Sequence, residues 1–240
     1  MGQSAYNRTN LPLEVISTGF LYLDQSLCIG GIPLGHLTEI SGEQSTGKTT
    51  LCLHIIAEAQ KSGGICAFID SDQSFNYHYA IQCDVLPDQL YLVRPTYAEG
   101  VLEIVDLLAR TKAFSAIIID SLTSLVPYAE LNAPTSAFVT ESIEPILSKA
   151  LPHLSMTIRD SQTALILTRD ASTGMSRVYH GLEDNLERLA LPLSAAVRLK
   201  LSRTVDTHTG QPTRRIQAQV VKNKFAPCSK TVDIDIIVNT

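Results

Sequence analysis

Long apolar runs are absent from this chain of 240 residues, and none approaches the ~20 residues that a helix needs to cross a bilayer. The N-terminus shows no basic segment followed by an apolar one, so we expect no secretory signal. No internal repeat or low-complexity segment is found. Cys-x-x-Cys pairs are also absent, and the odd number and wide spacing of the cysteines predict reduced, mostly buried thiols. These absences exclude a membrane protein, a fibre and a disulfide or zinc framework, and we expect a cytoplasmic protein.

Charge is unevenly distributed along the chain. The sequence holds 19 basic and 24 acidic side chains, for a net charge of −5 at pH 7. Between Arg198 and Lys230, however, eight residues are basic and only Asp206 is acidic. This basic segment is either a surface that faces phosphates or a solvated face. The length predicts one domain over 1–240, with 1–12 as an N-terminal tail.

Short β-branched runs alternate with segments of helical periodicity through the first two thirds of the chain, which is typical of β-α-β units and a parallel sheet. The predicted strands are 36–41, 65–70, 91–94, 116–120 and 163–168. The predicted helices are 49–61, 75–83, 98–112 and a longer segment at about 137–159. Because Pro145 and Pro152 fall inside the last segment, we expect that helix to be kinked or broken.

The periodicity changes to two in the last part of the chain, 195–240. Apolar and polar residues alternate over 197–202, 215–220 and 232–238. This alternation predicts an antiparallel extension with one solvated face at the edge of the parallel sheet. The segment 169–189, which is rich in charge, predicts a long surface loop.

The segment 42–49 fits the pattern Gly-x-x-x-x-Gly-Lys-Ser/Thr and lies between a predicted strand and a predicted helix. Backbone N–H groups and the helix dipole converge on an anion at such a place. Lys48 can place its charge on the β and γ phosphates, and the Thr49 hydroxyl can ligate Mg²⁺. We therefore predict a nucleotide site formed by Gly42, Glu43, Gln44, Ser45, Thr46, Gly47, Lys48, Thr49 and Thr50.

Acidic residues end two of the predicted strands. Asp120 would lie at the carboxyl edge of the sheet beside the phosphate loop, so Thr49 and Asp120 are the predicted metal ligands. Hydrolysis also needs a group that orients the attacking water. Asp70 or Asp72 can supply this group. The alternative interpretation is an acid on the surface at the end of a strand, and sequence spacing does not choose between these interpretations.

Further segments occur in a fixed order around these motifs: 16–24 (ISTGFLYLD), 30–35 (GGIPLG), 66–70 (CAFID), 119–121 (IDS) and 220–224 (VVKNK). Over about 13–238 they resemble the ATPase core of the bacterial RecA recombinase family. The resemblance implies an α/β fold of the RecA-like P-loop NTPase class, with a mostly parallel sheet flanked by helices and an antiparallel C-terminal extension. It also implies ATP and Mg²⁺ as cofactors.

The resemblance implies roles for individual residues. Lys48 and Asp120 would act on the phosphates and the metal, and Asp72 stands where the family has a catalytic glutamate. Shortening that side chain by one methylene is expected to slow the activation of water.

Four further positions correspond to the family's binding residues. Asn76 and Tyr79 stand at the adenine-side positions. ATP lies between protomers in filaments of this family, so Lys222 and Lys224 would reach the γ-phosphate of a neighbour.

Other positions depart from the family. Its Asn-Gln switch is Thr168-Arg169 here, and Arg169 is either an arginine finger that acts within its own chain or a surface residue. Glu130, Glu141 and Glu144 stand where the first DNA loop of the family and the following helix carry arginines, and carboxylates there would repel a phosphate backbone.

Three hypotheses follow from the resemblance and the departures. The first is a DNA-dependent ATPase of homologous recombination or DNA repair that binds single-stranded DNA as an ATP-gated oligomer. The second is a nucleotide-gated accessory paralogue with weak hydrolysis that regulates a recombinase partner. The third is a ring-forming regulatory or helicase-type ATPase on the same core.

Overall fold

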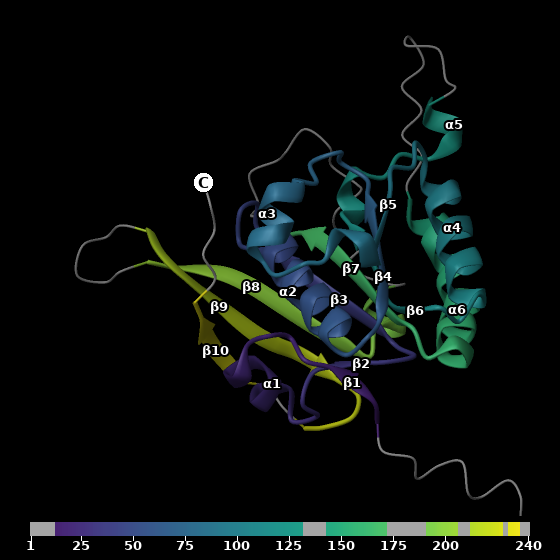
Figure 1. Ribbon diagram of the computed structural model, residues 1–240. Helices are drawn as coiled ribbons and strands as arrows, with labels where there is room; N and C mark the ends of the chain where they lie inside the picture. The colour runs from purple at the N-terminus through teal and green to yellow at the C-terminus, as the bar shows by residue number, and fades with distance from the viewer. Residues whose placement is uncertain (1–12, 132–142, 172–190, 206–211, 228–229, 236–240) are drawn as a thin grey trace, which may run out of the picture.

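The computed structural model describes residues 13–131, 143–171, 191–205, 212–227 and 230–235 (Figure 1). In this part of the chain an eight-stranded sheet has the order β10-β9-β8-β3-β7-β6-β4-β5. Its strands are β3 (Leu37–Gly42), β4 (Ile65–Asp70), β5 (Leu90–Val93), β6 (Phe114–Asp120), β7 (Ala164–Asp170), β8 (Val197–Val205), β9 (Pro212–Asn223) and β10 (Thr231–Ile234). A separate antiparallel pair is formed by β1 (Val15–Ile16) and β2 (Ile32–Pro33).

Strands β5, β4, β6, β7, β3 and β8 are joined by parallel pairings, whereas β9 pairs antiparallel with β8 and β10 pairs antiparallel with β9. This arrangement confirms the predicted fold class. The predicted parallel strands agree with the observed ones to within two residues at each end, and the alternating segments after residue 195 form the extension at the sheet edge (Figure 1).

Helices cover both faces of the sheet. They are α1 (Leu21–Leu27), α2 (Lys48–Lys61), α3 (Tyr77–Gln82), α4 (Ala98–Arg110), α5 (Tyr128–Leu131), α6 (Glu144–Ser161) and α8 (Leu191–Ser194), with short 3₁₀ turns at Pro87–Gln89 and Leu122–Ser124. One apolar core joins α2 to one face, and a second joins α4 and α6 to the other. Figure 1 shows α4 and α6 side by side, away from α2.

Helix α6 continues through Pro152, so the segment is not broken there. Pro145 lies in the first turn of the helix, where a missing N–H loses no helical hydrogen bond. Leu147, Leu151 and Ile158 are buried and recur at helical spacing. Their burial on the sheet face stabilises the helix against the local penalty of the internal proline.

Side chains alternate between the two faces along each central strand. Ile40 and Ile166 belong to the core under α2, whereas Leu37 and Leu167 belong to the core under α4 and α6. This alternation decides on which side of the sheet the polar residues at the strand ends lie.

The prediction of reduced, buried thiols is confirmed for Cys52, Cys66 and Cys83, which are free and buried. Burial raises the pKa of Cys66 to about 12, so this thiol stays protonated. The prediction is wrong for Cys28, which is disulfide-bonded. Cys228, like the predicted N-terminal tail 1–12, lies outside the described residues. Within the described ranges, no helix is long and apolar enough to span a membrane.

Candidate functional site: a phosphate loop at the carboxyl edge of the sheet

The predicted phosphate loop connects the end of β3 to the start of α2. Gly47 precedes the helix with a φ of 82°, a backbone conformation that glycine adopts without strain. A Cβ on Gly42 would lie 2.6 Å from both Leu201 O and Thr46 Oγ1, so only glycine fits there. Arg203 of β8 donates from Nε to Ser45 O at 2.9 Å and ties the loop to the neighbouring strand.

The ammonium group of Lys48 is held inside this loop. Its side chain is buried, and Nζ donates to Gly42 O at 3.0 Å and to Glu43 O at 2.7 Å. Nζ also forms an ion pair with Asp170 Oδ1 at 2.7 Å. The lysine therefore lies in the position that the motif predicts, but it is already paired with an acid.

Asp120 and Thr49 meet although 71 residues separate them. Thr49 Oγ1 donates to Asp120 Oδ2 at 2.6 Å, and Thr168 Oγ1 donates to Asp120 Oδ1. Burial raises the pKa of Asp120, and hydrogen bonds from Thr168 and Thr49 offset part of that rise. A buried carboxylate beside a helix N-terminus and a lysine is therefore the electrostatic centre of the site.

These oxygen atoms fit Mg²⁺. A magnesium ion takes hard oxygen ligands and usually keeps water and substrate phosphates in its shell, so one or two protein ligands suffice. Among the described residues, no group of three or more His, Cys, Asp or Glu side chains could hold a metal by itself. Thr49 Oγ1 and the Asp120 carboxylate would supply the ligands of the protein to such an ion.

Asp70 and Asp72 have different environments. Asp70 is fully buried and accepts from Ser74 N, Phe75 N and Arg94 Nε at 2.9, 3.2 and 2.9 Å. It therefore stabilises the turn after β4 and offers no oxygen to a ligand. Asp72 is exposed, and its carboxylate accepts from Ser74 N at 3.1 Å and from Ser74 Oγ at 2.6 Å. The negative charge of Asp72 also contributes to the raised pKa of Asp120.

The two predicted adenine-side residues lie on α3. Asn76 caps this helix by accepting from Tyr79 N at 3.1 Å. The hydroxyl of Tyr79 lies 2.8 Å from Thr50 Oγ1 on α2. The structure thus joins α3 to the first turn of the phosphate-loop helix.

Lys222 and Lys224 do not belong to this cluster. Lys222 pairs with Arg198 in the β8–β9 ladder, and Arg198 lies beside Glu39, three residues before Gly42. At about 3.3 Å per residue, this register separates Lys222 from the phosphate loop by about 10 Å along the strands. Lys224 Nζ donates to Leu193 O at 3.2 Å. Burial, with the charges of Lys224 and Arg198, lowers the pKa of Lys222.

Both interpretations of Arg169 are wrong. Its side chain is buried, and Nε donates to Glu39 Oε1 at 3.1 Å, while Arg198 Nε donates to Glu39 Oε2 at 2.6 Å. Along β7, Thr168 and Asp170 alternate with Arg169, so these two neighbours lie on the α2 face and Arg169 on the opposite face. Strand β7 thus includes the first two residues of the predicted loop 169–189, and residues 172–189 lie outside the described ranges.

Sequence reasoning missed Asp170, Thr168 and Arg203 as parts of the site. The alternation along β7 could have placed the first two beside the phosphate loop, whereas no sequence signal pointed to Arg203. Of the acids predicted to oppose DNA, Glu130 is exposed on α5 and Glu144 begins α6, while Glu141 lies outside the described residues.

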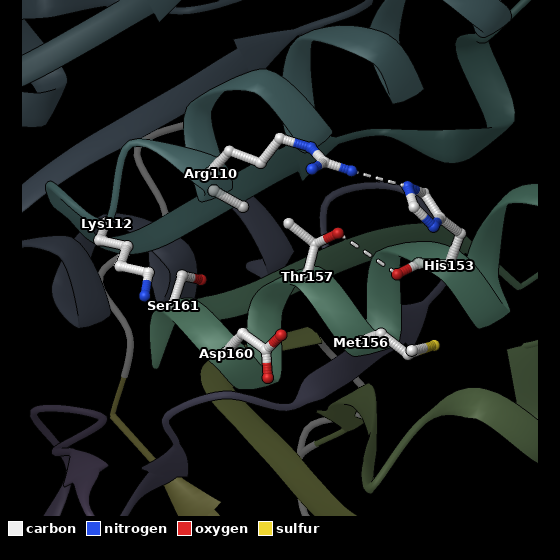
Figure 2. Close-up of a pocket in the computed structure, with 8 residues that line it drawn as sticks. Arg110, Lys112, His153, Met156, Thr157, Asp160 and Ser161 are labelled. Carbon is white, nitrogen blue, oxygen red and sulfur yellow. Dashed lines mark hydrogen bonds between the residues drawn. The ribbon is translucent and has the colours of Figure 1, made fainter.

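A cavity of about 440 Å³ lies between α4 and α6 (Figure 2). Figure 2 shows Arg110 pointing toward His153, and its Nη2 lies 3.0 Å from His153 Nε2. Asp106 accepts from Arg110 Nε at 2.6 Å and from Thr157 Oγ1 at 2.8 Å and so links the two helices. This cavity belongs to the face away from α2 and is separate from the phosphate loop.

Three features define a P-loop NTPase of the RecA-like class. They are a mostly parallel sheet, a phosphate loop between a strand and a helix, and a carboxylate at a strand end that accepts a hydrogen bond from the helix threonine. The family model described as the RecA N-terminal domain matches residues 3–240. The chain belongs to the RecA family. At the level of the family, this membership supports an ATPase of recombination and repair.

Individual proteins of this family are similar to the chain over nearly its whole length. The chain is 38% identical over 241 residues to Protein RecA of Chloroflexus aurantiacus, covering 100% of this chain and 68% of that protein. It is 39% identical over 236 residues to Protein RecA of Nitrobacter winogradskyi, covering 96% and 64%. It spans about two thirds of the length of these relatives. A crystal structure of the RadB recombinase has the same fold, with a TM-score of 0.67 at 20% identity, covering 91% of this chain and 94% of that chain.

Proposed function

We propose that this chain is a Mg²⁺-dependent ATP hydrolase of homologous recombination or DNA repair that binds single-stranded DNA as an ATP-gated oligomer. The observation that carries the proposal is the pairing of Thr49 with Asp120 beside Lys48 at the start of α2. Backbone N–H groups of residues 42–50 would cradle the phosphates, and Lys48 would neutralise charge on the β and γ phosphates. Mg²⁺, held by Thr49 and Asp120, supplies further neutralisation when bound.

The remaining predicted residues complete the site. Asp72 would orient the attacking water, since both oxygens of Asp70 are engaged by the turn. Asn76 and Tyr79 would border the adenine from α3. Lys222 and Lys224 lie too far along the sheet to serve their own phosphate loop, which supports a role in trans at the ATP of a neighbouring protomer.

A second candidate is the accessory paralogue with weak hydrolysis. It is supported by the contacts of Asp72, whose carboxylate is turned to Ser74, and by the burial of Arg169 away from the phosphate loop. Such contacts would not block nucleotide binding at the phosphate loop, but they would slow activation of the attacking water.

ATP turnover with and without single-stranded DNA tests the proposal. We expect turnover that rises with DNA and is lost in Lys48→Ala, while Lys61→Ala, at the exposed end of the same helix, keeps the activity of the unmodified protein. Unchanged turnover with DNA, together with no complex at low salt, would refute the DNA part of the proposal. Fast turnover by the protein alone would refute the accessory paralogue. Electron microscopy with a non-hydrolysable ATP analogue separates filaments from rings and monomers.

A further inference from the structure

Asp170 is an acid in the site to which the proposed reaction gives no role. It ends β7, and its backbone N–H donates to Thr123 Oγ1 at 3.0 Å. The next residue, Ala171, donates from N to Gly42 O at 2.9 Å, which fixes the end of β7 against the phosphate loop. The carboxylate of Asp170 is therefore held beside Lys48 by the backbone on both sides, although its side chain remains 33% exposed.

The pairing with Asp170 completes the hydrogen bonding of Lys48. An ammonium group has three N–H donors and no acceptor. Gly42 O, Glu43 O and Asp170 Oδ1 lie 3.0, 2.7 and 2.7 Å from Nζ and account for all three. A phosphate that arrives at Nζ must replace one of these partners. The two carbonyls belong to the phosphate loop itself and stay beside Nζ. The Asp170 carboxylate is an anion on another strand, and because an arriving phosphate is also an anion, the carboxylate is the partner that it replaces.

We propose that Asp170 competes with the nucleotide phosphate for Lys48 and thereby sets the affinity of the site. The carboxylate pairs with the same ammonium group that phosphate binding requires. After exchange, the same carboxylate lies close to the phosphate and repels it, because like charges at short range in a partly buried site are weakly screened. A triphosphate that also contacts the backbone N–H groups of the loop offsets this repulsion better than a single phosphate group does.

The inference rests on the proposed nucleotide site, and replacing Asp170 with asparagine tests it. Asp170→Asn removes the charge but retains an oxygen that can accept from Lys48. The dissociation constants of fluorescent ATP and ADP analogues with Mg²⁺ are measured for the unmodified protein and the variant. We expect binding about tenfold tighter in Asp170→Asn, which corresponds to about 1.4 kcal/mol. Asp170→Glu, which keeps the charge, should show no such gain.

Two controls separate competition from a general charge effect. Asp160→Asn removes one negative charge from the exposed end of α6, on the other face of the sheet, and should leave the affinity unchanged. In a Lys48→Ala background, Asp170→Asn should no longer tighten binding, since the ammonium group for which Asp170 and the phosphate compete is absent. The rise in melting temperature on adding nucleotide, relative to each variant without ligand, gives a second measurement and should be larger for Asp170→Asn.

The possible outcomes are distinct. If the unmodified protein binds nucleotide and Asp170→Asn binds it equally or more weakly, Asp170 does not compete and only this inference is overturned. An equal gain in Asp160→Asn overturns it as well. If neither protein binds nucleotide, the proposed nucleotide site is overturned and this inference with it.

Discussion

Replacing Glu39 with glutamine removes the carboxylate that pairs with two arginines of the neighbouring strands. Glu39 Oε1 lies 3.1 Å from Arg169 Nε, and Oε2 lies 2.6 Å from Arg198 Nε. The side chains of Glu39, Arg169 and Arg198 are 1%, 6% and 21% exposed. Glutamine keeps the shape of the side chain and one acceptor, but it removes the negative charge that both guanidinium groups contact. The change therefore acts on a buried charge and creates no cavity.

The burial of the cluster determines the size of the effect. Removing one partner of a buried ion pair costs about 3–5 kcal/mol, because the remaining charge stays desolvated. In a domain of this size each kcal/mol lowers the melting temperature by about 2–4 °C. We therefore expect Glu39→Gln to lower the melting temperature by about 10 °C. Because β3 leads directly into the phosphate loop, part of this loss should be recovered when nucleotide is added.

Circular dichroism during thermal and denaturant unfolding measures the change. Glu58→Gln is the matched control, since Glu58 pairs with the 56% exposed Lys61 at 2.8 Å on the surface of α2. Exposed pairs contribute less than about 1 kcal/mol, so the control should unfold almost as the unmodified protein does. A loss in Glu39→Gln no larger than that in Glu58→Gln would refute the argument from burial.

Two further predictions concern the site and the α4–α6 contact. Asp72→Glu extends the carboxylate by one methylene and should raise ATP turnover by up to about 100-fold, measured as phosphate release, whereas unchanged turnover would remove Asp72 from its proposed role. Burial opposes ionisation of Asp106, but hydrogen bonds from Arg110 and Thr157, with the nearby His153, lower its pKa from the ordinary value of an aspartate. Ionised Asp106 thus contributes stability above its unfolded-state pKa that is lost as the pH falls through the lower folded-state pKa. Asp106→Asn should cost up to about 1 kcal/mol at pH 7 in denaturant unfolding and progressively less as the pH falls through the folded-state pKa, and a cost independent of pH would contradict this.

Local patterns in the sequence were sufficient for the order of the elements. The alternation of β-branched runs and helical segments located the parallel strands to within two residues, because a buried parallel strand and an amphipathic helix each leave a periodic pattern. The helix through Pro152 was not predictable in this way. Burial of Leu151 and Ile158 on the sheet outweighs the local tendency of proline to break a helix.

The candidate site likewise has one part that the sequence determined and another that only the tertiary structure decided. The sequence by itself determined the phosphate loop, because its glycines, lysine and threonine are contiguous and each has a local physical role. Only the tertiary structure decided that the oxygens of Asp70 are engaged, that Arg169 is buried with Glu39, and that Asp170 pairs with Lys48. These contacts join residues from different strands, and they depend on strand register and on which face of the sheet each side chain occupies. A shift of one residue in that register would reverse the face of every side chain on the strand, and spacing along the chain does not specify the register.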